Sequence, residues 1–350
     1  MTHSSTCGIC CKDNILFLYT SCDRQNTKNK EKTFSYYRCL DCDVVFVSPK
    51  ISLDEYATYY DTSYVSHQTG GASQKQKSNK TSSLRERVRS HISRSKKRVW
   101  LCMHRIDFFQ ERVASLSWFK KIYVRIFSLS KFFKAQPFLF SVKNMSVCDI
   151  GCGVGNFLTK MRDKNWSVEG VEPSSFAVDV CETKNIKVQK MFFDRERVVR
   201  HRKVDLVTLN QVLEHLSDSH MALDNVSDTL KQGGVLYINT PNHDSFVAKL
   251  FKTYWYNLDA PRHMFIFSPK SLQKILEGKG FDVHRVYTSS STSGFTGSLE
   301  YFLRDGLGLR ISSDRIRKNK ILNKLCVPVV FVLDLFKKGD NVHIIAQKNN

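Results

Sequence analysis

The chain has few of the residues that interrupt regular structure, with only 7 prolines and 16 glycines among 350 residues. Collagen-like chains and Pro/Gly-rich disordered chains are therefore excluded. Long apolar runs are also missing, because the late run from Cys326 to Leu333 is interrupted by Pro328 and followed by Asp334. A membrane-spanning helix needs about 20 apolar residues, so none is predicted. The length suits one large domain, or a medium domain with a small satellite.

A secretory signal is not expected either. The segment Met1–Cys7 has neither a basic region nor an apolar stretch, so we predict a cytoplasmic protein. Eleven cysteines in such a chain indicate reduced thiols or metal ligands rather than disulfides.

Acidic residues are scarce, with 33 Asp and Glu against 54 Lys and Arg, for a net charge of +21. Two segments hold almost all of this excess. Residues 75–136 have 17 basic and 3 acidic side chains, a net charge of +14, and residues 302–338 have 9 and 3, a net charge of +6. The rest of the chain is close to neutral.

The pattern changes along the chain. We distinguish four zones: a cysteine-rich segment over residues 1–65, a polar flexible linker over 66–83, a basic segment with the spacing of amphipathic helices over 84–140, and a region of alternating strands and helices over 141–350. Strands are predicted at Ser146–Ile150, Ser167–Val171, Ile186–Gln189, Val204–Leu209 and Val235–Thr240. Helices are predicted between them at Asn156–Lys164, Ser174–Lys184 and Met221–Lys231. This alternation predicts an α/β fold with a doubly wound parallel sheet and a ligand crevice at the carboxyl ends of the strands.

A glycine-rich turn follows the first of these strands. Gly151, Gly153 and Gly155 occupy alternate positions, which lets the backbone turn tightly and approach a ligand. Asn156 stands where a dinucleotide fingerprint needs its third glycine, so that motif is not met. Glu172 ends the next strand, 21 positions after Gly151, where a carboxylate can accept both ribose hydroxyls of an adenosine. The alternative is a tight turn beside a solvent-exposed strand end.

Four motifs in order carry a family resemblance. They are Asp149–Leu158, Gly170–Ser174, Asp205–Leu216 and Leu230–Asn242, and together they resemble class I S-adenosylmethionine-dependent methyltransferases. The resemblance implies a seven-stranded Rossmann-like sheet and S-adenosylmethionine as the cofactor. It implies that the three glycines lie near the methionine part, Glu172 on the ribose and Asn210 beside the sulfonium. We add the neighbouring Asp149, Asn156 and Gln211 to the cofactor set, with Met191 and Phe192 as candidates for the adenine.

Two matched cysteine pairs precede this region. Cys7 and Cys10 form one Cys-x-x-Cys pair, and Cys39 and Cys42 form another after 28 intervening residues. Four thiolates in this pattern suit tetrahedral, structural Zn²⁺, with free thiols as the alternative. The segment from Tyr36 to Tyr64 is similar to the zinc ribbon that precedes methyltransferase domains in bacterial sugar and surface-polysaccharide gene neighbourhoods. The other cysteines are expected mostly to pack in the core.

Methyl transfer to an alcohol needs a base that takes the hydroxyl proton. Glu214 and His215 follow the fourth strand on a predicted helix, and His263 follows the fifth. Packing at the helix start is an equal alternative for His215. Arg262 is expected to bind a phosphate or carboxylate of the substrate, because guanidinium pairs with such groups in bidentate geometry. The Pro-Arg-His phrase that includes His263 is similar to one in the same subfamily.

The two basic segments permit three interpretations. They could lie on an anionic membrane surface near lipid-linked glycan, bind nucleic acid phosphates, or cover the substrate crevice with their side-chain stems. Nucleic acid is the least favoured, because no RNA-domain motif occurs.

These observations together predict a zinc ribbon over 1–65 and a methyltransferase domain over 141–350 with a helical insertion at about 296–338. The expected reaction is methylation of a hydroxyl of a saccharide, nucleotide-sugar or lipid-linked glycan. The expected location is the cytoplasm, with peripheral contact at the inner face of the membrane. The alternatives are an RNA-directed methyltransferase and a noncatalytic module that keeps the cofactor fold.

Overall fold

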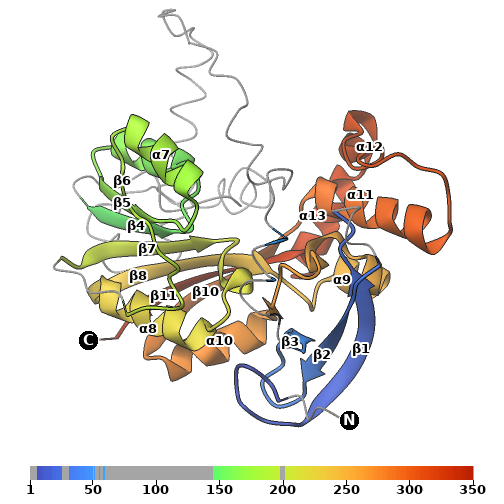
Figure 1. The fold of residues 1–350 in the computed structure, drawn as a ribbon, viewed down its shortest axis with the longest axis horizontal. Coiled ribbons are helices and arrows are strands. Elements are labelled where there is room, and N and C mark those ends of the chain that lie inside the picture. Colours follow the sequence, from blue (N-terminus) through green and yellow to red (C-terminus); the bar gives the residue numbers. More distant parts are fainter. Residues whose placement is uncertain are drawn as a thin grey trace, which may run out of the picture.

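The computed structural model describes residues 6–25, 31–49, 51, 55, 58–59, 145–197 and 202–349. The predicted linker over 66–83 and the predicted helical segment over 84–140 lie outside these residues. The described residues form two β-sheets, one of seven strands and one of four (Figure 1).

The larger sheet has seven strands in the order β10-β11-β8-β7-β4-β5-β6. Its strands are β4 (Ser146–Ile150), β5 (Ser167–Val171), β6 (Lys187–Gln189), β7 (Val204–Asn210), β8 (Leu230–Pro241), β10 (Phe281–Ser289) and β11 (Asn341–Lys348). All neighbours pair in parallel except β11, which runs antiparallel to both β8 and β10. The chain reverses its winding direction between β4 and β7, and such a switch point opens a ligand crevice at the strand ends. The predicted doubly wound, seven-stranded fold is confirmed.

Helices cover both faces of this sheet. They are α6 (Asn156–Arg162), α7 (Ser175–Thr183), α8 (Ser219–Thr229) and α10 (Pro269–Gly278). Leu223 of α8 and Leu272 of α10 share one buried cluster with Ile238 of β8. Met161 of α6 shares a second cluster with Tyr237, the preceding residue of the same strand. Successive strand residues point to opposite faces, so the two clusters are the two sides of the sheet.

The helix predicted at Met221–Lys231 is displaced by two residues. It begins at Ser219 because the side chain of Asp218 accepts a hydrogen bond from the Met221 N–H and caps the first turn. It ends at Thr229 because Leu230 already pairs with Val204 as the first residue of β8.

The smaller sheet joins the cysteine-rich segment to the rest of the protein. It contains β1 (Ile15–Cys22), β2 (Thr33–Cys39), β3 (Val45–Ser48) and β9 (Phe265–Ile266), in that order and all antiparallel. The strand β9 comes from the loop region after β8, and Phe46 pairs with Phe265. The described residues from Cys7 to Ser48, called the cysteine-rich unit below, are therefore joined to the large domain through β9.

Helical elements connect the remaining strands. Between β7 and α8 lies the 3₁₀ turn η4 (Leu213–His215), and after β8 come α9 (Phe246–Phe251), η5 (Lys252–Tyr254) and η6 (Tyr256–Leu258). Between β10 and β11 lie α11 (Thr292–Tyr301), the π-helical turn η7 (Phe302–Gly306), α12 (Lys320–Leu325) and α13 (Val327–Leu335). Within the part of the chain that the structure describes, no helix could span a bilayer.

Candidate active site and cysteine cluster

The glycine-rich turn runs from the end of β4 into α6. Gly151 and Gly155 have φ angles of +65° and +72°, a conformation that favours glycine. A Cβ at Gly151 would come within 2.5 Å of the Val212 Cγ2 atom, and one at Gly155 within 2.9 Å of the Cys181 Sγ atom. Among the described residues, no atom lies within 4 Å of the position that a Cβ at Gly153 would take. The turn therefore packs closely against the protein at Gly151 and Gly155, whereas Gly153 leaves room for a ligand. We call this room above Gly153 the cradle.

Glu172 connects this turn to the end of β5. Its Oε2 atom accepts a hydrogen bond from the Gly153 N–H at 2.9 Å, and its Oε1 atom accepts one from the Ser174 N–H at 3.0 Å. A carboxylate can accept about four hydrogen bonds, so Glu172 keeps acceptor capacity for a ligand. The structure therefore brings the predicted glycines and the predicted ribose-binding carboxylate together.

Asp149 lies in β4, just before the turn. The Thr208 hydroxyl donates a hydrogen bond to its Oδ1 atom at 2.5 Å, and burial raises the pKa of Asp149 to about 7. This geometry makes Asp149 a link between β4 and β7. Asn156 starts α6, and its Oδ1 atom accepts from the Lys184 ammonium at 3.3 Å.

The polar residues at the carboxyl end of β7 are hydrogen-bonded to residues of β8 and β11. The Asn239 Nδ2 atom donates to the Asn210 Oδ1 atom at 2.7 Å, and the Gln211 N–H donates to the Asn239 carbonyl at 2.7 Å. Gln211 also donates through its amide to the Asn341 Oδ1 atom at 3.2 Å. Asn210 and Gln211 are both exposed at the carboxyl end of their strand.

The two adenine candidates differ in environment. Phe192 is 45% exposed, and the Arg195 guanidinium lies 3.6 Å from the centre of its ring. Met191 is half-buried against the core. Asp194 accepts hydrogen bonds from the Ser217 N–H and hydroxyl, so its carboxylate is engaged within the protein. Phe192 is therefore the more exposed of the two predicted adenine residues.

The three residues predicted to be catalytic come together at one buried place. A carboxyl oxygen of Glu214 and one ring nitrogen each of His215 and His263 lie within 4.8 Å of one another, and the two imidazole centres are 4.6 Å apart. Glu214 and His215 belong to the 3₁₀ turn η4 rather than to a longer helix. His263 lies just before β9, so the small sheet helps to place it.

The hydrogen bonds of the two imidazoles assign their tautomers. The His263 Nδ1 atom lies 2.7 Å from the Asn257 carbonyl, and the His215 Nδ1 atom lies 3.0 Å from the Arg262 carbonyl. A carbonyl oxygen only accepts, so each ring donates its Nδ1–H and carries its lone pair on Nε2. The His263 Nε2 atom lies 3.9 Å from the Asp259 Oδ2 atom.

Burial changes the protonation of these groups in different ways. It raises the pKa of Glu214 to about 8 and lowers the pKa of His215 to about 3. Burial also lowers the pKa of His263, but the nearby Asp259 carboxylate opposes that effect. The Thr240 hydroxyl donates to Glu214 Oε2, while Glu214 Oε1 is buried and has no hydrogen-bond partner among the residues that the structure describes. The raised pKa therefore favours the neutral acid form of Glu214 at pH 7.

Arg262 was predicted to bind substrate, and in the structure its guanidinium is paired with two carboxylates of the protein. Its Nη1 and Nη2 atoms donate to the two carboxylate oxygens of Asp23, both at 2.8 Å, and Nε and Nη2 donate to Asp259 Oδ1 at 3.0 and 2.7 Å. The residue is 1% exposed. The guanidinium therefore already makes, with Asp23, the bidentate pair that was expected with a phosphate or carboxylate of the substrate. Asp23 and Asp259 were not among the predicted site residues.

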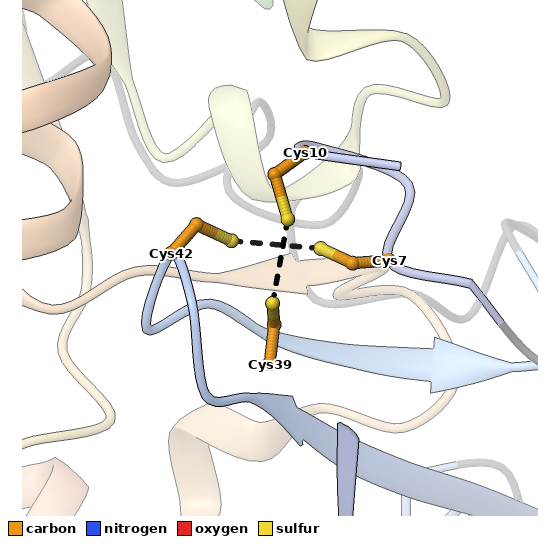
Figure 2. A group of neighbouring side chains, drawn as sticks. All are labelled: Cys7, Cys10, Cys39 and Cys42. Atoms are coloured by element: carbon orange, nitrogen blue, oxygen red, sulfur yellow. Dashed lines mark hydrogen bonds between the residues drawn. The ribbon is translucent and has the colours of Figure 1, made fainter. Parts of the chain in front are cut away.

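The four paired cysteines converge at one end of the cysteine-rich unit (Figure 2). The Sγ atoms of Cys7 and Cys42 are 3.5 Å apart, those of Cys10 and Cys39 are 3.4 Å apart, and all four lie within 4.8 Å of one another. A tetrahedral Zn²⁺ with Zn–S distances of about 2.3 Å places its sulfurs about 3.8 Å apart. The donor set and spacing therefore fit a zinc ion.

The other described cysteines lie outside this cluster. Cys11 is exposed and Cys22 is half-buried, while Cys148, Cys152, Cys181 and Cys326 are buried, as expected for packing residues.

Comparison with known proteins agrees with the fold. Residues 127–286 match a family model described as a methyltransferase domain. The ubiquinone biosynthesis O-methyltransferase of Coxiella burnetii is 27% identical over 135 residues, which cover 37% of this chain and 55% of that protein. The C-methyltransferase NovU of Streptomyces niveus is 26% identical over 152 residues, covering 42% of this chain and 35% of that protein. The chain thus spans about half the length, or less, of these curated relatives.

A solved S-adenosylmethionine-dependent methyltransferase from Archaeoglobus fulgidus is 21% identical, with a TM-score of 0.42 over 64% of this chain and 94% of that one. The sheet order and the family match define a class I, Rossmann-like methyltransferase fold. Residues 127–286 are thus similar to a methyltransferase domain. Its relatives carry the names of both O- and C-methyltransferases.

Proposed function

We propose that the protein transfers a methyl group from S-adenosylmethionine to a small acceptor, and that the cofactor binds at the turn after β4. The observation that carries this proposal is the pairing of the open cradle above Gly153 with the Glu172 carboxylate 2.9 Å from its N–H. The three glycines would face the methionine part, Glu172 the ribose, Phe192 the adenine and Asn210 the sulfonium. Asp149, Asn156, Met191 and Gln211 would support this set.

The base that completes the reaction is His263 in this proposal. When bound, S-adenosylmethionine supplies an electrophilic methyl group, whose bond to sulfur breaks with its electron pair left on sulfur as the bond to the acceptor forms. The proton of the group that receives the methyl would then pass to the Nε2 atom of His263, which carries the lone pair of a neutral ring. His263 is preferred over His215 because burial lowers the pKa of His215 to about 3, and because the Asp259 Oδ2 atom lies 3.9 Å from the His263 Nε2 atom.

We propose a hydroxyl of a saccharide, nucleotide-sugar or lipid-linked glycan as the acceptor. The support is the similarity of the cysteine-rich unit to ribbons found near sugar and polysaccharide genes, together with relatives named for O-methyl transfer. A name for C-methyl transfer among the relatives makes an acidic C–H of a similar molecule the second candidate, with the same base.

The test has two stages. S-adenosylmethionine is titrated into the full-length protein by calorimetry, and then nucleotide-sugars and lipid-linked sugars are screened for release of S-adenosylhomocysteine. Binding followed by release with a sugar supports the proposal. Absence of binding would indicate a noncatalytic module, and release only with RNA would favour the RNA-directed alternative.

We propose that the four-cysteine cluster holds a structural zinc ion. Cys7, Cys10, Cys39 and Cys42 offer four thiolates, which close a tetrahedral site and leave no open position. Zinc there would join the loop before β1 to the loop after β2 without taking part in the chemistry.

We also propose that the helical insertion contacts an anionic membrane surface. Its exposed apolar side chains include Ile321, Leu325 and Phe336, which are 73%, 68% and 74% exposed. Exposed basic residues occur beside them and have no ion pair within the described residues: Arg310, Arg315, Lys320, Lys324 and Lys337. The basic segment over 75–136 has the same sign of charge, so it is not the electrostatic partner of this surface.

Sedimentation with vesicles tests this contact. Vesicles that contain phosphatidylserine should bind the protein at low salt and release it at high salt, and binding should fall in an Ile321→Ser/Leu325→Ser/Phe336→Ser variant. Equal sedimentation with neutral and anionic vesicles would contradict the proposal. Concentration-dependent dimers without vesicles would show that a second copy covers the surface instead.

A further inference from the structure

The first cysteine pair touches the segment that carries the proposed base. Gly8 lies between Cys7 and Cys10, and a Cβ at Gly8 would come within 2.9 Å of the Phe265 Cζ atom and 3.0 Å of its Cε1 atom. Among the described residues other than the chain neighbours of Gly8, only these two ring atoms lie within 4 Å of that position. The missing side chain therefore lets the loop of residues 7–10 lie directly on the Phe265 ring.

The cysteine cluster fixes the position of this loop. The Ile9 N–H donates a hydrogen bond to the Cys7 Sγ atom at 3.4 Å, and the Cys11 N–H donates one to the Cys7 carbonyl at 2.9 Å. The loop thus folds around the first thiol of the cluster. Cys7, Ile9 and Phe265 are buried in one apolar core. A zinc ion bound to the cluster would hold the surface against which the Phe265 ring packs.

Phe265 follows His263 by two residues, and the segment between them is held from two sides. The Met264 N–H donates to the Glu214 carbonyl at 2.8 Å, and the Met264 carbonyl accepts from the Val47 N–H at 3.2 Å. Directly after Met264, β9 pairs with β3. The segment therefore joins the cysteine-rich unit to the turn η4, and the backbone of His263 leads straight into it.

We propose that Phe265 is a positioning residue, which transmits the position of the loop of residues 7–10 to the His263 imidazole. The loop packs against the ring, the ring sets where β9 lies, and β9 sets the backbone that carries the base. A displacement of about 1 Å can lower the rate of a reaction about 100-fold. The proposal deepens the proposed function, on which it rests, and gives the cysteine-rich unit a part in placing the base.

Two complementary substitutions isolate this contact. Gly8→Ala adds a methyl group that pushes against the Phe265 ring, and the backbone of Gly8 is not at positive φ, so alanine can adopt it. Phe265→Leu removes the outer ring atoms that Gly8 approaches. In the double variant the alanine methyl fills part of the space that leucine leaves. A contact that transmits position therefore predicts a double variant closer to the wild type than either single variant.

The same loop offers a matched control at its other side. The His220 Nε2 atom lies 2.5 Å from the Ile9 carbonyl, and His220 belongs to α8 rather than to the segment of His263. His220→Ala removes this contact of the loop and leaves the Phe265 ring in place. A general loosening of the loop predicts similar effects for His220→Ala and Gly8→Ala, whereas the proposal does not.

The test records the imidazole signals of His263 in the full-length protein by NMR with ¹⁵N-labelled histidine, assigned from their loss in His263→Gln. The ring centre of His215 lies 4.6 Å from that of His263, so a displacement between the rings changes the chemical shift. We expect Gly8→Ala and Phe265→Leu each to shift the signals and to lower turnover about 10-fold. The Kd for S-adenosylmethionine and the zinc content should stay at the wild-type values. The double variant should recover most of both changes.

The proposal is overturned if both single variants keep the wild-type signals of His263, if their effects add in the double variant, or if His220→Ala shifts the signals as much as Gly8→Ala. Should Phe265→Leu not fold, the comparison of Gly8→Ala with His220→Ala decides the question alone. Failure of the proposed function would be seen separately, as absence of S-adenosylhomocysteine release from the wild type, while the signals of His263 stay measurable.

Discussion

The N–H of Gly153 donates a hydrogen bond to the Glu172 carboxylate across 2.9 Å, and this bond joins the turn after β4 to the end of β5. The two residues come from separate motifs of the sequence and meet because β4 and β5 are neighbours in parallel pairing. Their contact places a negative charge beside the open cradle, which is the arrangement on which the cofactor proposal depends.

The charge of Glu172 should matter for cofactor affinity. Glu172→Gln keeps an acceptor oxygen but loses the charge, and hydrogen bonds to a charged group contribute about 1.5–3 kcal/mol. We expect the Kd for S-adenosylmethionine to rise about 10- to 100-fold in calorimetric titration. Glu182→Gln on the exposed side of α7 removes the same charge and should leave the Kd unchanged. An unchanged Kd in Glu172→Gln would place the ribose elsewhere.

The turn itself should not tolerate a side chain at Gly151. Gly151→Ala forces a Cβ to within 2.5 Å of the Val212 Cγ2 atom at a φ of +65°, so we expect a loss of about 1–3 kcal/mol in the free energy of unfolding. Gly278→Ala in α10, where a Cβ meets no atom within 4 Å, should be neutral or slightly stabilising. Urea denaturation compares the two, and equal stability would show that the turn is not constrained.

Glu214 should make the stability of the protein depend on pH. Burial raises its pKa from 4.5 to about 8, so the folded state holds the proton more tightly than the unfolded state does. Below pH 4.5 this carboxyl is protonated in both states and does not change the free energy of unfolding. As the pH rises toward 8 it ionises in the unfolded state only, which lowers the free energy of unfolding. We expect the free energy of unfolding to fall by roughly 1–4 kcal/mol over this interval in the wild type.

Glu214→Gln isolates that contribution. The amide keeps an oxygen for the Thr240 hydroxyl and cannot ionise, so the pH dependence should be smaller by the same amount. Asp149 and Asp340, whose pKa values burial raises to about 7 and about 6, titrate in both proteins and cancel in the difference. Parallel curves for the two proteins would contradict the prediction.

The cysteine cluster should determine the metal content. Cys42→Ser removes one of four thiolates, and we expect zinc measured by atomic emission to fall from about one ion per chain to well below that. Cys11→Ser, at an exposed cysteine outside the cluster, should keep the wild-type content and melting temperature. Equal zinc in both variants would exclude the cluster as the site.

Local patterns were sufficient to predict the large sheet. Ser146–Ile150 and Ser167–Val171 were predicted with the bounds that the structure has, because both are short apolar runs between turn residues. The glycines and Glu172 were also predicted to meet, since motifs at the ends of neighbouring parallel strands must lie together.

Long-range pairing could not be predicted in this way. The strand β9 has two residues and pairs with β3 more than 200 positions earlier, and no periodicity marks so short a strand. Arg262 was assigned to the substrate because its bidentate geometry suits phosphate, but the same geometry suits the carboxylate of Asp23. The spacing of Asp259, Arg262 and His263 at i, i+3 and i+4 was the available signal that these side chains interact.

The most direct test of the account is the rate of S-adenosylhomocysteine release by His263→Gln, measured with the sugar acceptor that the wild type methylates. The account predicts wild-type affinity for S-adenosylmethionine, an unchanged circular dichroism spectrum and a turnover lower by about 10²- to 10⁴-fold, while His284→Gln on β10 keeps full activity. Wild-type turnover in His263→Gln would contradict the assignment of the base. A wild-type protein that binds no S-adenosylmethionine would contradict the account as a whole.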